Sequence, residues 1–118
     1  MMRFKGKQIY LACGATDMRN NIDGLAAAVR SGFQVNPMSN AIFVFCNAMK
    51  DRVKILEWDG DGFWLHYKRL ERGRFPWPNT SGGEATIRLT QKELEYLLSG
   101  EKLKLKFERI DYSERSTV

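Results

Sequence analysis

Several runs of hydrophobic residues in this chain have the length or the alternation of β-strands, and two stretches have the period of a helix. Residues 9–13 form a short apolar run that predicts a strand ending at Gly14. Residues 41–46 form a second run without a polar position, which is typical of a central strand covered on both faces. The pattern therefore predicts a sheet whose middle is buried on both sides.

Two further runs flank a turn that is rich in aspartate and glycine. Residues 53–58 and 63–68 are joined by residues 59–62, in which Gly60 and Gly62 can take a positive φ. Either closure of this turn pairs the last residue of the first run with the first residue of the second. Together with the apolar run before them, these segments predict three consecutive antiparallel strands, a β-meander.

The alternation assigns the side chains of this hairpin to two faces. One face is apolar or aromatic and consists of Leu56, Trp58, Phe63, Leu65 and Tyr67. The other face is mixed and consists of Val53, Ile55, Glu57, Trp64, His66 and Lys68. The mixed face is either partly exposed to solvent or covered by another element, and the pattern leaves both arrangements open.

The first helical stretch follows the predicted first strand. Its apolar residues share one face and are Ile22, Leu25, Ala26 and Val29. We expect Thr16 or Asp17 to cap this helix and Gly32 to end it. Because Gly24 lowers its stability by about 1 kcal/mol relative to alanine, either packing on the sheet compensates or the glycine permits a close backbone approach.

The second helical stretch begins with a capping box at residues 90–93, after a predicted short strand at residues 85–89. Its apolar stripe consists of Leu94, Leu97 and Leu98, and Gly100 is the expected stop. A half-buried strand is predicted beyond it from the alternation of Leu103, Leu105 and Phe107 with lysines. We thus expect a single α+β domain over residues 1–110, an antiparallel β-meander sheet packed with one or two helices, and a disordered tail at residues 111–118.

Composition narrows the class of protein. The 118 residues carry a net charge of +5 and a pI near 9.4, which favours anionic partners where the positive charge is local. Cys13 and Cys46 lie in apolar runs and are expected to be reduced, buried thiols. Without a signal-peptide pattern or an apolar stretch long enough to span a bilayer, the chain is expected to be cytoplasmic.

The positive charge is local in the segment after the hairpin. It carries Lys68, Arg69, Arg72 and Arg74 against Glu71 alone, and it leads into an irregular loop at residues 73–83. Cationic groups neutralise phosphates and aromatic rings stack on unpaired bases. We therefore select six residues as the candidate nucleic-acid or partner contact: Lys68, Arg69, Arg72, Arg74, Phe75 and Trp77.

Two other interpretations of this loop stay open. Phe75 and Trp77 can instead fold back onto the core, with Pro76 and Pro78 holding the backbone extended. The loop can also dock a protein, since aromatic residues framed by prolines suit such contacts.

Patterns for catalysis or cofactor binding are mostly absent. His66 is the sole histidine and has no serine or cysteine nucleophile nearby in the sequence, so a structural or surface role is expected. A calcium loop beginning at Asp59 would need an oxygen ligand at position 63 and a glutamate at position 70. The chain has Phe63 and Leu70 there, so the pattern excludes this type of calcium site. We expect no catalytic residue, no bound metal and no cofactor. A two-metal nuclease, which needs converging carboxylates, is the least favoured alternative.

Several segments together resemble one family, the protein of the second open reading frame of insertion-sequence-66 elements, the TnpB-type or Orf2-like proteins. The resemblance runs from about residue 8 to about residue 98 and is carried by order and spacing rather than by a single motif. The segments are 16–19, 23–26, 43–45, 51–56, 58–65 and 68–78.

The resemblance implies a bacterial accessory protein of transposition that is encoded beside a separate, catalytic transposase. The resemblance implies no catalytic residues for this chain. The leading hypothesis is thus a non-catalytic module that binds element DNA, the transposase or both. A pure protein adaptor without DNA contact is the main alternative, and the oligomeric state stays open.

Overall fold

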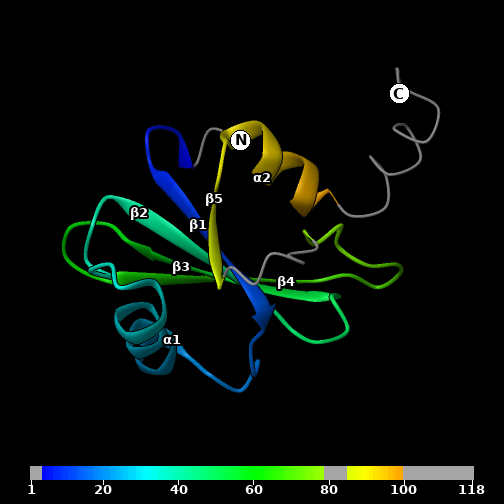
Figure 1. Ribbon diagram of the computed structural model, residues 1–118, viewed down its shortest axis with the longest axis horizontal. Helices are drawn as coiled ribbons and strands as arrows, with labels where there is room; N and C mark the ends of the chain where they lie inside the picture. The colour runs from blue at the N-terminus through cyan, green and yellow to red at the C-terminus, as the bar shows by residue number, and fades with distance from the viewer. Residues whose placement is uncertain (1–3, 79–84, 100–118) are drawn as a thin grey trace.

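The computed structural model describes residues 4–78 and 85–99 of the chain. Five strands form one sheet in the order β4-β3-β2-β1-β5 (Figure 1). The strands are β1 (Gln8–Ala15), β2 (Ala41–Cys46), β3 (Arg52–Trp58), β4 (Phe63–Arg69) and β5 (Thr86–Leu89). The helical segments are α1 (Ile22–Ala28), its continuation η2 (Val29–Phe33) and α2 (Gln91–Leu98). The predicted α+β class is confirmed.

The predicted β-meander is present as β2, β3 and β4, each antiparallel to the next. The hairpin closes in the expected register, with Trp58 opposite Phe63 and Leu56 opposite Leu65. Two pairings were not predicted. Strand β1 lies parallel to β2, which makes the sheet mixed, and β5 lies antiparallel to β1. The chain can join parallel neighbours here because α1 and η2 form the long crossover that such a connection requires.

The beginning of α1 differs from the prediction. The helix begins at Ile22 with Asn21 as its N-cap, so the expected cap at Thr16 or Asp17 is wrong. Asp17 cannot serve the helix because its carboxylate accepts hydrogen bonds from the backbone N–H and the guanidinium of Arg19 in the preceding turn. A short polar side chain whose oxygen atoms accept hydrogen bonds within its own loop cannot also cap a helix that begins later.

The end of this helical segment also differs from the prediction. Gly32 does not end it, since η2 continues as one π-helical turn to Phe33. Gln34 takes a left-handed conformation with φ 57° and donates its backbone N–H to the Val29 carbonyl, which closes the helix. Of the two alternatives for Gly24, packing on the sheet is present, since Leu25 and Val29 are buried in the cluster on this side. The group close to Gly24 is the side chain of Asn20 and not another backbone segment.

Hydrophobic side chains form two clusters, one on each side of the sheet, and Figure 1 shows α1 and α2 on opposite sides. On the α1 side, Leu25 and Val29 pack with the apolar face of the hairpin. On the α2 side, Leu94 and Leu97 pack on the mixed face, so that face is partly covered by a helix. Strand β2 is buried at every position and contributes to both clusters, as its apolar run predicted.

The capping box of α2 is confirmed by both of its hydrogen bonds. Thr90 Oγ1 accepts from the Glu93 N–H at 3.1 Å, and Glu93 Oε1 accepts from the Thr90 N–H at 2.8 Å. Strand β5 precedes it as expected. The expected stop at Gly100, the strand predicted at residues 103–107 and the predicted tail lie outside the described residues.

Both cysteines are buried, and no disulfide joins them. Burial raises the pKa of the Cys46 thiol to about 11, which disfavours the reactive thiolate. Within the part of the chain that the structure describes, every helix is too short or too polar to cross a membrane.

Candidate functional site

Three loops meet at one end of the sheet, which we call the basic end. They are residues 16–21 after β1, residues 47–51 after β2 and residues 70–78 after β4. They meet because β1, β2 and β4 run in the same direction, so their carboxyl ends share one edge.

Backbone hydrogen bonds fasten these loops to one another. Thr16 N–H donates to the Cys46 carbonyl at 2.7 Å and links the first loop to the end of β2. Leu70 N–H donates to the Asp51 carbonyl at 2.8 Å, and Phe75 N–H donates to the Lys50 carbonyl at 2.7 Å. The segment between Leu70 and Phe75 is therefore held at both of its ends.

Basic side chains outnumber acidic ones at this end of the molecule. The acidic ones are each paired, with contacts of 2.6 Å from Arg19 to Asp17, 3.9 Å from Arg52 to Asp51 and 3.0 Å from Arg69 to Glu71. Three further cations, Lys50, Arg72 and Arg74, form no ion pair with any described residue. The basic end thus retains uncompensated positive charge.

Asp17 and Arg19 form the shortest of these three ion pairs. Hydrogen bonds from the Arg19 side chain and then from its backbone lower the pKa of this carboxyl to about 2. Both residues are exposed, so the pair mainly shapes the turn after β1 and removes Arg19 from the uncompensated charge.

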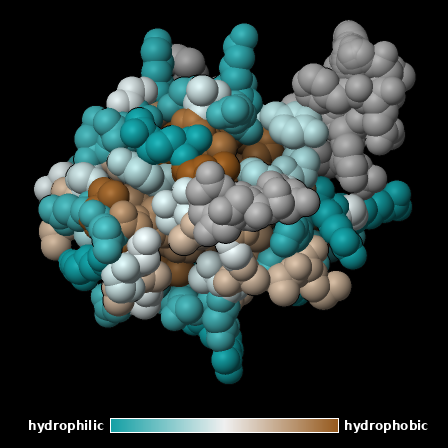
Figure 2. Space-filling model, viewed as in Figure 1, coloured by the Kyte–Doolittle hydropathy of each residue, from teal (hydrophilic) through white to brown (hydrophobic). Residues whose placement is uncertain are grey.

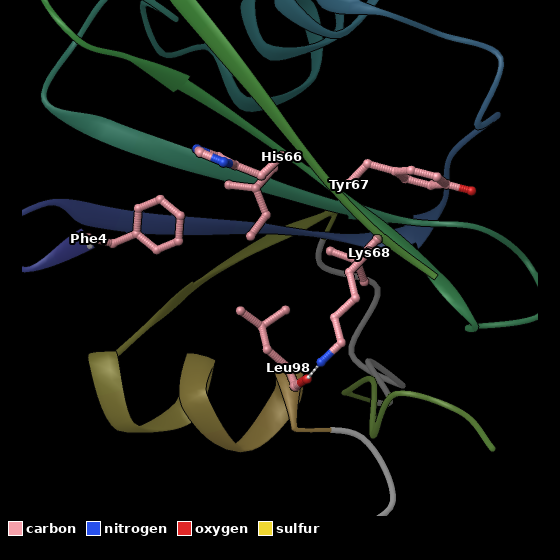
Figure 3. Close-up of a pocket in the computed structure, with 7 residues that line it drawn as sticks. Phe4, His66, Tyr67, Lys68 and Leu98 are labelled. Carbon is pink, nitrogen blue, oxygen red and sulfur yellow. Dashed lines mark hydrogen bonds between the residues drawn. The ribbon is translucent and has the colours of Figure 1, made fainter. Parts of the chain in front are cut away.

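The six predicted contact residues separate into four groups, three of them cationic and one aromatic. Arg72 and Arg74 are exposed and unpaired within the described residues, as a phosphate contact requires. Arg69 is exposed but pairs with Glu71. Lys68 donates from Nζ to the carbonyl of Leu98 at 2.7 Å and so holds the end of α2 against β4 (Figure 3).

Phe75 and Trp77 are not available for base stacking, which corrects that part of the prediction. Their exposed fractions are 2% and 9%, and both belong to the core cluster on the α2 side. The Trp77 indole N–H donates to the Ala12 carbonyl at 3.1 Å. The alternative interpretation, in which both rings fold back onto the core, is therefore confirmed. Burying two large aromatic rings is more favourable than leaving them in water beside the arginines.

The turn at residues 59–62 has a structural role in this arrangement. Asp59 N–H donates to the Gly62 carbonyl at 3.0 Å, and Gly60 has a φ of 105°. The Asp59 carboxylate accepts from the Trp64 indole N–H, and this bond lowers the pKa of the carboxyl. Across residues 4–78 and 85–99, no three histidine, cysteine, aspartate or glutamate side chains lie close enough together to hold a metal ion.

Lys54 has a role that the sequence reasoning missed. Its side chain is buried, and Nζ donates to the carbonyls of Met18 and Asn20, each at 2.8 Å. The ammonium group thereby anchors the loop after β1 at the basic end. The available signal was a lysine on the otherwise apolar face of the hairpin, where a buried charge needs polar partners.

A second buried polar group lies on the opposite face of the hairpin. Glu57 has an exposed fraction of 8% and accepts a contact from His66 Nε2 at 2.8 Å and from Lys7 Nζ at 3.3 Å. The His66 ring also stacks on the exposed indole of Trp64, with the ring centroids 6.2 Å apart. The structural role expected for His66 is thus supported by its partners.

Two cavities lie near these residues. One, of about 390 Å³, opens at the basic end and is bordered by the exposed side chain of Met49 and by Arg52. The other, of about 190 Å³, lies between β4 and the end of α2 (Figure 3). In the space-filling view, hydrophilic side chains project around the margin and hydrophobic residues show between them (Figure 2).

The chain matches the family model described as IS66 Orf2 like protein over residues 7–107. It belongs to the IS66 Orf2-like family. Membership implies a role associated with transposition, and this is not a family of known catalysts. The match reaches beyond residue 98, where the resemblance in the sequence ended.

Two relatives from Sinorhizobium fredii (strain NBRC 101917 / NGR234) are similar to this IS66 Orf2-like chain. "Uncharacterized protein y4hO" is 40% identical over 93 residues, which cover 79% of each chain. "Uncharacterized protein y4jC" is 33% identical over 96 residues, which cover 81% of this chain and 80% of the relative. No solved structure matches the chain.

Proposed function

We propose that this protein is a non-catalytic accessory of transposition that binds the DNA of its element through the basic end, while a separate transposase cuts the strands. The observation that carries the proposal is the uncompensated charge of Lys50, Arg72 and Arg74 on loops that are fastened together. A cationic surface of this kind suits the phosphate backbone of DNA.

The geometry favours contacts to phosphates rather than to bases. Residues 71–74 are tethered at Leu70 and Phe75, so Arg72 and Arg74 project from a loop whose ends do not move freely. Both aromatic rings that could have stacked on bases are buried. Binding should therefore depend strongly on salt and weakly on sequence.

Support for the absence of catalysis comes from the reactive side chains. The imidazole of His66 is engaged by Glu57, and the Cys46 thiol is buried with a raised pKa. Neither group is poised as a nucleophile or a general base for an external substrate. DNA incubated with the protein and magnesium or manganese is expected to stay uncut.

Fluorescence anisotropy with labelled element-end DNA over a range of salt concentrations tests the proposal. The double variant Arg72→Ala/Arg74→Ala should bind more weakly, and the slope of log affinity against log salt should flatten by roughly two units, because each lost phosphate contact removes about 0.9. Folding should be nearly unchanged, since both side chains are exposed.

Arg30→Ala/Lys92→Ala is the matched control. It removes the same charge from exposed positions on η2 and α2, away from the basic end. Equal slopes for the two double variants would refute binding through this loop.

A protein adaptor without DNA contact is the second candidate, and one observation favours it. Met49 is 62% exposed beside the cavity at the basic end, where its flexible apolar side chain is available to pack against a protein partner. Co-purification with the transposase in the absence of DNA, lost on Met49→Lys while DNA affinity persists, would favour this role.

A further inference from the structure

Strand β4 is a long edge of the sheet. It has seven residues and pairs only with β3 among the described residues, whereas β5 at the other edge has four. The side chains of Trp64 and Tyr67 on it are 53% and 54% exposed. A long edge strand with exposed aromatic side chains is a template for pairing with another strand.

The hairpin geometry decides which backbone groups of β4 are available. Asp59 N–H bonds the Gly62 carbonyl at the closing pair of the turn, and hydrogen-bonded pairs alternate along an antiparallel ladder. The backbone groups of Trp64, His66 and Lys68 therefore face β3. Those that face away from the sheet belong to the alternate residues Phe63, Leu65, Tyr67 and Arg69.

We propose that two copies of this chain associate by antiparallel pairing of their β4 strands about a two-fold axis at His66. His66 is the midpoint of the strand, so all seven residues pair in this register. Leu65 then lies opposite the partner's Tyr67, and both expose outward backbone groups. The result is one continuous sheet through both copies, with the same surface used on each side.

The aromatic rings and the cations of β4 complement one another in this register. Aromatic residues occupy the beginning of the strand and cations occupy its end. Antiparallel pairing at His66 places Trp64 opposite the partner's Lys68 and Phe63 opposite the partner's Arg69, so each cation meets an aromatic ring. A parallel pairing would instead place Lys68 beside the partner's Lys68.

The cavity beside β4 fits the same arrangement. It is bordered by Lys68 and by the apolar side chains of Phe4, Val53 and Leu98 (Figure 3). Trp64 and Lys68 lie on this face of the sheet, so the partner's Trp64 would lie at the cavity beside Lys68. Association would thus cover an indole that is 53% exposed in the single chain.

Sedimentation equilibrium of the full chain over a wide concentration range tests the proposal, which does not depend on DNA binding. The wild-type chain should reach the mass of a dimer. Trp64→Lys should weaken association by about 100-fold, because each dimer contains the contact twice and each loss is worth about tenfold. Trp64→Glu removes the same ring but should retain association, since a carboxylate then faces the partner's Lys68.

Combining Trp64→Lys with Lys68→Glu places a lysine opposite the partner's glutamate and should restore the dimer. Lys68→Glu alone is the control, because it also removes the hydrogen bond from Lys68 Nζ to the Leu98 carbonyl. Equal weakening by Trp64→Lys and Trp64→Glu would overturn the register, and a wild-type monomer at every concentration would overturn the dimer. A cooperative thermal unfolding transition is the control that each variant is folded.

Hydrogen exchange of the wild-type chain gives an independent measurement. The amides of Leu65 and Tyr67 should become protected as concentration rises. Protection that is already complete in the monomer would show that the chain's own residues cover this edge, which would overturn the proposal.

Discussion

Replacing Lys54 with methionine tests whether a buried ammonium group organises the basic end. Methionine keeps an unbranched apolar side chain in the buried strand and removes the charge. The bonds lost are those from Nζ to the carbonyls of Met18 and Asn20, each 2.8 Å long, and a longer contact of 3.3 Å to Asn21 Oδ1.

The expected change in the free energy of unfolding combines two opposing effects. A hydrogen bond to a charged group contributes about 1.5–3 kcal/mol, and two good ones are lost. Burying an ammonium group is itself unfavourable by several kcal/mol, and that penalty disappears in the variant. The carbonyls of Met18 and Asn20 belong to half-buried residues that water can reach, so we expect a net loss of about 2 kcal/mol.

Urea denaturation of Lys54→Met measures this loss, and Lys5→Met is the matched control because Lys5 is exposed. Hydrogen exchange should accelerate in residues 17–21, the loop that the ammonium anchors. The reasoning would be refuted by a free energy of unfolding equal to that of the control. DNA affinity should change only through the loop, since the charge of Lys54 is buried.

Two further predictions concern stability and reactivity. Gly60→Val should lower the free energy of unfolding by about 1–3 kcal/mol, because a β-branched residue is strained at a φ of 105°; unchanged thermal stability with lost transposition would instead make the turn a contact site. Cys46 should react with iodoacetamide only on unfolding. Rapid labelling of the native chain would contradict this. Because the pKa of Cys46 is raised to about 11 in the fold, the free energy of unfolding should not depend on this thiol below its usual pKa of 9.0. It should fall as the pH rises from 9.0 towards 11.

The sequence alone determined those features that depend on neighbouring residues. The apolar run of β2 predicted burial on both faces, and β2 is buried at every position. The hairpin register followed from the turn at residues 59–62, and the start of α2 followed from the capping box at Thr90 and Glu93. Side-chain alternation and capping bonds act over a few residues, so local order carries enough information to predict them.

Tertiary structure decided those features that join distant segments. The Trp77 indole N–H donates to the carbonyl of Ala12, which is 65 residues away in the sequence. The Lys54 ammonium group donates to the carbonyl of Met18, which is 36 residues away. No local pattern shows that two aromatic rings beside arginines will be buried while Arg72 and Arg74 stay exposed. The choice depends on which surface the folded sheet leaves uncovered, and on the parallel pairing of β1 with β2 that brings the loops of the basic end together.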